Sequence, residues 1–175
     1  VTTPPYTAYL KIAEGCSNGC AFCIIPKLRG RYRSRSMGSL LAEAKKLSDS
    51  GVRELIVIAQ DITRYGLDLE EKTSLARLVK ELCRLDFRWI RLHYLYPEAI
   101  TDELIQVIAS EPRVLHYLDI PIQHCNDGIL KAMRRRNTRA ELEALFVRLR
   151  SAMPDVVIRT SLICGLPGEG EAEFE

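Results

Sequence analysis

The sequence alternates short apolar runs with longer amphipathic segments, and this alternation constrains the fold more than any other feature. Residues 54–59 form a nearly continuous apolar run, which is typical of a strand buried on both faces of a parallel sheet. Residues 73–84 then place leucine and valine at the i, i+3, i+4, i+7 spacing of a helix with one buried face. Further strands are predicted at residues 8–12, 88–94, 115–120 and 156–163, and further helices at residues 38–49 and 128–133 and after the capping residues Thr101 and Thr138.

Strands that alternate with helices along a chain usually pair in parallel through right-handed crossovers. We therefore predict an α/β fold with five parallel strands, too few to close an eight-stranded barrel. A chain of 175 residues is long enough for one domain with a substantial core.

Polar residues follow each predicted strand. In parallel α/β folds the reactive groups gather at the carboxyl ends of the strands, so these residues are expected along one rim. They are the cysteine-rich loop after the first strand, Gln60 and Asp61 after the second, residues 93–97 after the third, Gln123 and His124 after the fourth, and Cys164 and Gly165 after the fifth.

The first of these loops contains Cys16, Cys20 and Cys23 in a C-x3-C-x2-C pattern. Three thiols within eight residues can reach one inorganic centre, because closing such short loops costs little chain entropy. Structural zinc usually takes four protein ligands, whereas a 4Fe-4S cluster can accept three cysteines and leave one iron open. The alternative is a zinc loop completed by His93 or His124.

This spacing, with Phe22 before the third cysteine, resembles the radical S-adenosylmethionine (radical SAM) enzymes. The resemblance implies that the three cysteines hold a 4Fe-4S cluster and that S-adenosylmethionine binds its open iron. It further implies that an external electron donor reduces the cluster, which then releases a 5′-deoxyadenosyl radical. Phe22 is placed beside the adenine, and the fold is expected to be a partial (β/α) barrel with about five of the usual six units.

Residues 9–15, 24–36 and 165–169 resemble the methylthiotransferases of that family. Those enzymes insert sulfur at an unactivated C–H bond and add a methyl group. Asp61 and residues 92–97 and 118–124 are similar to the branch that modifies an aspartate of protein number twelve of the small ribosomal subunit. The alternatives are the branch that modifies an adenosine of transfer RNA and, in another class, a non-catalytic zinc-binding interaction module.

The resemblance also implies two domains that we expect to be absent from residues 1–175, which we interpret as a truncated radical SAM core. One is an amino-terminal domain with three cysteines that hold a second, auxiliary 4Fe-4S cluster. The other is a carboxy-terminal domain of RNA-binding type. Cys83, Cys125 and Cys164 lack the spacing needed to replace the missing three cysteines.

Four residues outside the cysteine loop are candidate contacts of bound S-adenosylmethionine. Gln60 and Gln123 offer hydrogen bonds at the rim, and Gly165 lies in the turn after the fifth strand. Arg159 lies inside that strand, where a bare charge is costly unless it is paired. It is expected to meet either the cofactor's carboxylate or a structural Asp or Glu. No residue is assigned as a general acid or base.

Residues 93–96 include three side chains that either shape a substrate pocket or serve the structure alone: His93, Tyr94 and Tyr96. Two basic segments are also present. Lys27, Arg29, Arg31, Arg33 and Arg35 recur at every second position, which in an extended segment gives one basic face, open to ribosomal RNA or simply solvated. Arg134, Arg135, Arg136 and Arg139 are interpreted as a basic helix end.

The composition is that of an ordinary globular protein, with 47% hydrophobic and 27% charged residues and a net charge of +2. No apolar run approaches the roughly 20 residues of a membrane span, so no membrane partner is expected. Six cysteines, half of them in one tight cluster, favour a reducing compartment over a disulfide framework. We therefore expect a cytoplasmic protein.

Overall fold

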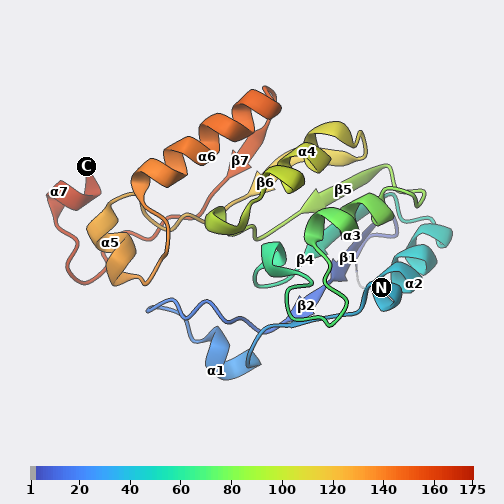
Figure 1. Ribbon diagram of the computed structural model, residues 1–175, viewed down its shortest axis with the longest axis horizontal. Coiled ribbons are helices and arrows are strands. Elements are labelled where there is room, and N and C mark those ends of the chain that lie inside the picture. Colours follow the sequence, from blue (N-terminus) through green and yellow to red (C-terminus); the bar gives the residue numbers. More distant parts are fainter. Residues whose placement is uncertain (1–2) are drawn as a thin grey trace.

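The computed structural model describes residues 3–175 and contains one sheet of five strands, all paired in parallel. The strand order, β1-β4-β5-β6-β7, follows the order along the chain (Figure 1). The predicted parallel α/β fold is therefore confirmed. The strands are β1 (Thr7–Lys11), β4 (Glu54–Ile58), β5 (Trp89–Leu92), β6 (Val114–Asp119) and β7 (Val157–Arg159).

The crossover helices lie side by side on one face of this sheet (Figure 1). Helix α3 contacts both α2 and α4, and α4 also contacts α6. The core lies between these helices and the sheet, and it is built mainly from leucine, isoleucine and valine. The helices are α2 (Met37–Asp49), α3 (Leu75–Leu82), α4 (Asp102–Ser110) and α6 (Arg139–Ala152).

The opposite face of the sheet is much less covered by the described residues. On β1, Ala8 and Leu10 are buried under the helices, whereas Tyr9 between them is 51% exposed. The inner strand β4 is buried on both faces, as its continuous apolar run predicts. Ile56 is 8% exposed there, although it points away from the helix layer. One face is therefore a packed core, and the other is open.

Helix starts follow the predicted capping residues. Thr138 accepts a hydrogen bond from the backbone N–H of Glu141, and the Glu141 carboxylate accepts one in return from the N–H of Thr138. Thr101 likewise accepts from the N–H of Leu104. These side chains satisfy backbone donors that have no partner inside the helix. The predicted starts of α4 and α6 are confirmed for this reason.

Several short elements were not predicted, because each has too few residues to show a hydrophobic period. The predicted strand at residues 156–163 is also too long, since β7 is an edge strand and only Leu162 pairs beyond it, in a single bridge to Gln123. The elements that were not predicted are β2 (Ala13–Glu14), α1 (Ile25–Arg29), β3 (Arg33–Ser34) and the 3-10 helices η1 (Ile62–Arg64) and η2 (Pro97–Ala99). The helix predicted at residues 128–133 is confirmed as α5 (Asp127–Ala132), and a short helix, α7 (Glu171–Phe174), follows the turn after β7.

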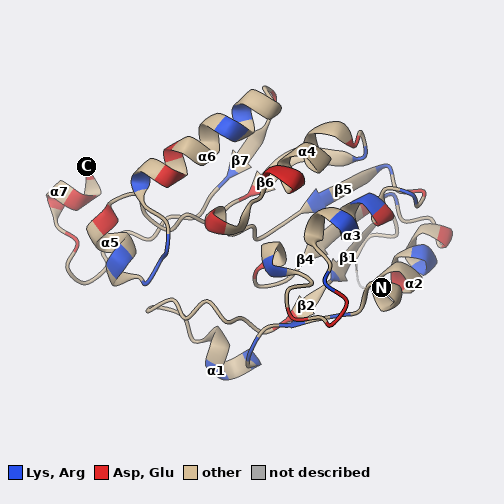
Figure 2. Ribbon diagram, in the orientation of Figure 1, with Lys and Arg blue, Asp and Glu red and all other residues tan. Residues whose placement is uncertain are grey.

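The expectation of one extended basic face is wrong for its first half. Lys27 and Arg29 lie on helix α1, where alternate residues do not share a face. Arg33 lies on β3, and Arg35 turns back to pair with Glu43 at 2.6 Å. Figure 2 shows that the basic residues continue from α1 along the connection towards α2. None of the helices within residues 3–175 is long and apolar enough to cross a membrane.

Candidate functional site

The loops that follow neighbouring strands are hydrogen-bonded to one another at the carboxyl end of the sheet. The N–H of Ile62, after β4, donates to the carbonyl of Tyr94, after β5, at 3.1 Å. The N–H of Leu95 donates in turn to the carbonyl of Asp119, at the end of β6, at 2.9 Å. The predicted gathering of these loops at one rim is therefore confirmed, and the cysteine loop leaves β1 at the same end.

The cysteine loop is fixed at its start by backbone contacts. The N–H of Cys16 donates to the carbonyl of Gly30 at 3.1 Å, and the N–H of Tyr32 donates to Ser17 Oγ at 3.1 Å. Gly15 has φ +77°, and a Cβ on it would lie 2.2 Å from the Arg31 carbonyl oxygen. Glycine is therefore required here both by conformation and by space.

The structure places the three cysteines in this one loop as free thiols. Cys16 and Cys20 are buried, Cys23 is half-buried, and the N–H of Cys23 donates to the carbonyl of Cys20 at 3.1 Å. Burial raises the pKa of Cys16, and the charge of the nearby Asp61 adds to the shift. A cation or a cluster would compensate the charge of such thiolates.

Within residues 3–175, no three Cys, His, Asp or Glu side chains converge closely enough to hold one metal ion. Among these residues, His93 and His124 are accordingly not grouped with the three cysteines. The ligands of a 4Fe-4S cluster bind different irons, so their sulfur atoms need not converge on one point. A donor set of three thiols in one loop fits a cluster in this respect.

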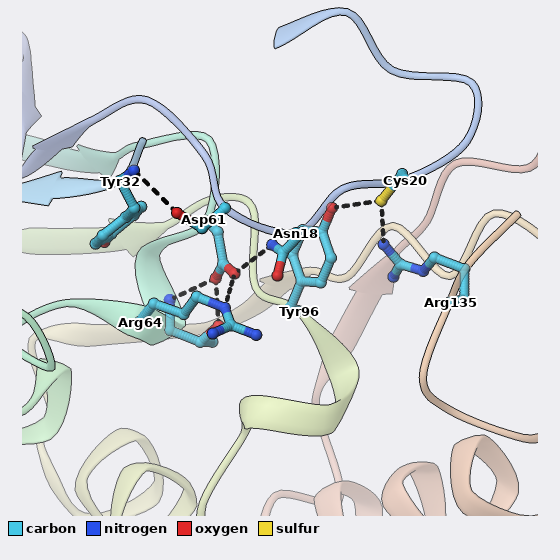
Figure 3. Close-up of polar contacts among 9 residues, drawn as sticks. Asn18, Cys20, Tyr32, Asp61, Arg64, Tyr96 and Arg135 are labelled. Carbon is cyan, nitrogen blue, oxygen red and sulfur yellow. Dashed lines mark hydrogen bonds and ion pairs between the residues drawn. The ribbon is translucent and has the colours of Figure 1, made fainter. Parts of the chain in front are cut away.

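Asp61 joins the cysteine loop to the end of β4, a role that was not predicted. Its side chain is fully buried, and Oδ2 accepts a hydrogen bond from Asn18 Nδ2 at 2.8 Å (Figure 3). The same oxygen lies 3.2 Å from Arg64 Nε, and Oδ1 accepts from the N–H of Thr63 at 3.1 Å. Asn18 lies between the first two cysteines, so Asp61 fixes the middle of the loop.

Tyr96 and Arg135 approach Cys20 from two further loops (Figure 3). Tyr96 Oη lies 3.4 Å from Cys20 Sγ, and Arg135 Nη1 lies 3.9 Å from the same sulfur. Burial raises the pKa of Tyr96, so its hydroxyl keeps its proton and can donate to the sulfur. The N–H of Ala21 also donates to the carbonyl of Met133 at 3.0 Å, which ties the loop to the end of α5.

Arg135 corrects the prediction of a uniform basic helix end. Arg134 and Arg136 follow α5 and are exposed, but Arg135 between them is only 7% exposed. Arg139 lies at the start of α6 rather than at a helix carboxyl end, and it pairs with Glu143. Buried and exposed residues alternate here although the segment is a loop. The three consecutive arginines are identical in sequence, so nothing in the sequence distinguished Arg135 from its neighbours.

Gln60 lies at the rim beside the cysteine loop, as predicted. It lines a surface pocket together with Lys11, Ile58, Ala59 and Tyr94. Its Oε1 atom is buried and has no hydrogen-bond partner among residues 3–175. A buried acceptor without a partner is costly, and a ligand that donates a hydrogen bond would remove this cost. The contact between Gln60 and S-adenosylmethionine remains a prediction, and the unpartnered Oε1 atom is a reason to expect it.

The other predicted cofactor contacts are spread along the rim. Phe22 is 42% exposed in the cysteine loop. Gln123 has φ +72° and pairs through its backbone with the segment after β7, and Gly165 has φ +78° in an open turn. The roles of these three residues in binding S-adenosylmethionine therefore stay predictions.

Arg159 has an acidic partner in the protein itself. Its Nη1 donates to Asp119 Oδ1 at 2.8 Å, and its side chain is 52% exposed on the open face. The premise that its charge is buried inside a strand is therefore wrong, because β7 is an edge strand. Of the two expected partners, the structure provides the acidic side chain, and a contact with the cofactor stays a prediction.

The three aromatic candidates after β5 occupy different environments. His93 stacks near Tyr117 with ring centroids 5.9 Å apart, and burial lowers the pKa of His93. Tyr94 is exposed, with φ +64°, whereas Tyr96 contacts Cys20. His124 lies 3.5 Å from Glu169 in the turn after β7. A substrate pocket formed by these residues remains a prediction.

The fold and this rim define a parallel α/β protein with a three-thiol loop at the carboxyl end of its first strand. Such a loop is suited to an iron–sulfur cluster with an open iron. The chain belongs to the Radical SAM superfamily, whose family model matches residues 10–175.

Curated relatives resemble the chain over nearly its whole length. A protein of Citrifermentans bemidjiense named ribosomal protein uS12 methylthiotransferase RimO is 57% identical over 175 residues, which cover 99% of this chain and 39% of that protein. A protein of the same name from Geobacter sulfurreducens is 56% identical over 99% of this chain and 39% of its own. The chain therefore spans about two fifths of the length of these relatives.

Solved structures share the fold at low sequence identity. The radical S-adenosylmethionine methyltransferase TsrM from Kitasatospora setae, solved with tryptophan and a SAM analogue, has a TM-score of 0.76 at 18% identity, covering 97% of this chain and 32% of TsrM. The cobalamin-dependent S-adenosylmethionine radical enzyme OxsB has a TM-score of 0.67 at 16% identity, covering 89% of this chain and 23% of OxsB. These similarities concern the fold alone.

Proposed function

We propose that this chain is the radical SAM core of a methylthiotransferase that modifies an aspartate of ribosomal protein uS12, protein number twelve of the small subunit. The observation that carries the substrate is the set of relatives with that name, which are 51–57% identical over nearly the whole chain. The transfer-RNA branch is disfavoured by Asp61, whose carboxylate pairs with Arg64 at 3.2 Å, a charge that the asparagine typical of that branch lacks.

Cys16, Cys20 and Cys23 would hold a 4Fe-4S cluster that leaves one iron for S-adenosylmethionine. Three observations support this assignment: the thiols share one loop, Arg135 lies beside Cys20 without an acidic partner among the described residues, and Gln60 Oε1 lacks a donor. When bound, the two groups supply a one-electron cleavage that ends in the removal of a hydrogen atom from an unactivated carbon.

The residues around the loop would bind and orient these groups. Asp61 holds the loop through Asn18, and Gln60 offers an acceptor to the amino group or a hydroxyl of S-adenosylmethionine. Phe22, exposed beside the cysteines, would cover the adenine. Gln123, in the loop after β6, and Gly165, in the turn after β7, would contact S-adenosylmethionine from the other end of the row of strands. The electrons would come from an external donor.

Further parts of the full-length protein would complete the reaction. An amino-terminal domain would hold the auxiliary 4Fe-4S cluster that delivers sulfur, and a carboxy-terminal domain of RNA-binding type would help to dock the ribosomal substrate. Arg29, Arg31 and Arg33 are exposed beside the cysteine loop and would contact ribosomal RNA next to uS12. The protein would act in the cytoplasm, where thiols stay reduced.

The test uses the full-length protein, reconstituted anaerobically with iron and sulfide and supplied with S-adenosylmethionine and a reductant. Both uS12 and transfer RNA are offered, and the products are identified by mass spectrometry. We expect a methylthio group on one aspartate of uS12. Cys16→Ala, Cys20→Ala and Cys23→Ala are each expected to lose the core cluster and the product. Cys125→Ala, which changes an exposed thiol outside the loop, is the matched control and is expected to keep both.

Each alternative gives a distinct result. Methylthiolated adenosine without a modified aspartate would overturn the ribosomal substrate and favour the transfer-RNA branch. A colourless protein with one tightly held zinc, lost in the three loop variants, would favour the zinc-binding interaction module.

A further inference from the structure

Arg135 is a buried cation whose partners differ from those of other arginines near the rim. Arg135 is only 7% exposed, although it lies in the loop after α5 between two exposed arginines. Its Nη2 donates to the carbonyl of Pro121 at 3.0 Å, and its Nη1 reaches Cys20 Sγ at 3.9 Å. Its Nε has no hydrogen-bond partner among residues 3–175.

The charge of Arg135 lacks a carboxylate to balance it. Arg64 and Arg159, in contrast, each pair with a buried aspartate. Within the described chain, no Asp or Glu oxygen lies within ion-pair distance of Arg135. A buried charge is costly unless it is paired. The group that lies beside it is the sulfur of Cys20, which would carry negative charge as the ligand of a cluster.

Tyr96 holds this arrangement from the other side. The guanidinium carbon of Arg135 lies 4.2 Å from the centre of the Tyr96 ring, a cation–π contact. The hydroxyl of the same ring lies 3.4 Å from Cys20 Sγ (Figure 3). One sulfur therefore faces a hydroxyl donor and a guanidinium, which come from the loops after β5 and α5. The geometry is of a sulfur atom with two polar groups aimed at it, both of which can donate hydrogen bonds to a cluster ligand.

We propose that Arg135 and Tyr96 are positioning residues that hold Cys20 as a cluster ligand and raise the reduction potential of the bound cluster. The inference rests on the proposed function, because it requires a cluster on the loop. One-electron reduction adds a negative charge to the cluster. A buried guanidinium and a hydrogen bond to the ligand sulfur both stabilise that added charge, and such contacts are among the factors that set the potentials of these clusters.

The test compares the reduction potential of the cluster in the full-length protein and its variants, by redox titration followed with electron paramagnetic resonance. A Cys20→Ala sample identifies the signal of this cluster against that of any auxiliary cluster. For Arg135→Gln we expect the one-electron equilibrium to shift about tenfold against reduction, or ~59 mV. Arg135→Lys keeps the charge and is expected to show less than half of that shift. Arg136→Gln, which changes the exposed neighbour, is the matched control and is expected to leave the potential unchanged.

Tyr96→Phe keeps the ring under the guanidinium and removes only the hydroxyl. We expect it to shift the equilibrium about threefold in the same direction, since the hydrogen bond to the ligand sulfur is lost while the guanidinium remains. This variant decides the question if Arg135→Gln fails to fold. A mere structural role for Arg135 would lower stability without moving the potential.

The possible results separate this inference from the proposed function. Wild-type protein that holds no iron would overturn both. A wild-type cluster combined with an unchanged potential in folded Arg135→Gln, or in Tyr96→Phe where Arg135→Gln does not fold, would overturn this inference and leave the proposed function standing. Negative shifts in both variants, with none in Arg136→Gln, would support it.

Discussion

At the scale of single residues, the rim is organised by side chains that satisfy several partners at once. Asp61 is the clearest case, because its two oxygens serve the cysteine loop, its own turn and Arg64. A buried carboxylate that accepts hydrogen bonds and lies beside an arginine is less costly to bury than one without partners. The middle of the cysteine loop is thereby held to the sheet before any cluster binds. Asn18 Oδ1 remains buried without a partner among the described residues, which leaves it able to bind a donor from a ligand.

Removal of the Asp61 carboxylate should therefore destabilise the protein and loosen the loop. We expect Asp61→Ala to lower the free energy of unfolding by about 3 kcal/mol, because it leaves Asn18 and Arg64 without their partner. Asp61→Asn should cost less, since the amide keeps one acceptor. Denaturant unfolding measures both. Asp49→Asn, at an exposed pair with Lys45, is the control and should change stability by less than about 0.5 kcal/mol. An equal effect at both sites would contradict the anchoring role.

The two glycines of the cysteine loop provide a second test at this scale. Both have positive φ, +77° at Gly15 and +64° at Gly19, but only Gly15 lacks room for a Cβ. Gly19→Ala should cost about 1 kcal/mol from the left-handed conformation alone. Gly15→Ala should cost more than ~2 kcal/mol, because the methyl group would displace the backbone at Arg31. Thermal unfolding and the iron bound per chain after reconstitution measure the difference, and equal losses would show that the Gly15 contact is unimportant.

At the scale of elements, the sequence predicts those parts whose hydrophobic period is long enough to be recognised. The crossover helices and the five strands were found because each buries one face, or both, against the same core. Short elements such as α1 and β3 could not be found, since two to five residues show no period. Their positions are set by contacts with distant residues, as when Ser34 binds Asp68. The end of the strand predicted at residues 88–94 was also overestimated, because the positive φ at Tyr94 depends on the loops around it.

The site shows the same division. The cysteine loop and Gln60 were predicted, because ligand spacing and a strand end are local features of the sequence. Arg135 was not predicted, because its burial depends on contacts with Cys20, 115 positions away in the chain, and with Tyr96. No local pattern could report such pairs. Asp61 was noticed at a strand end, but its partner Asn18 lies 43 positions earlier.

The turn after β7 provides a prediction for an element. Glu169 accepts a hydrogen bond from the N–H of Leu166 at 2.9 Å and lies 3.5 Å from His124, and these contacts lower the pKa of Glu169 from its usual 4.5. A carboxylate with a lowered pKa stabilises the fold above its unfolded pKa and loses this effect as the pH falls through the folded value.

The stability difference between wild-type protein and Glu169→Gln should therefore be largest above about pH 4.5 and should shrink as the pH falls below it. Denaturant unfolding from pH 7 to pH 3 measures the difference at each pH. Glu143→Gln, at an exposed pair with Arg139, is the control and should give a small difference at every pH. A difference that stays constant through the acid range would show that the Glu169 charge is not what closes the turn.

At the scale of the whole molecule, the helices cover one face of the sheet and the candidate site occupies one end (Figure 1). The open face carries polar and aromatic side chains, among them Tyr9, Arg91 and Trp89. This face is therefore less apolar and less covered than the face under the helices. Under the proposed function, the cysteine loop at the rim would hold the cluster and S-adenosylmethionine.

This arrangement separates two activities of residues 1–175 prepared alone. We expect this segment to cleave S-adenosylmethionine to 5′-deoxyadenosine after reconstitution and reduction, because the cysteine loop and its supports lie within it. We expect no methylthio group on uS12, because Cys83, Cys125 and Cys164 are scattered and do not group with other possible ligands in the described chain. Burial moreover raises the pKa of Cys83 to about 12, so it is a poor ligand. Chromatography of the nucleoside and mass spectrometry of uS12 measure the two products.

The full-length protein is the positive control, and Cys16→Ala in the segment should abolish the cleavage. Complete methylthiolation by the segment would show that the auxiliary cluster is not needed, whereas folded, iron-loaded segment without cleavage would show that the core depends on the rest of the protein.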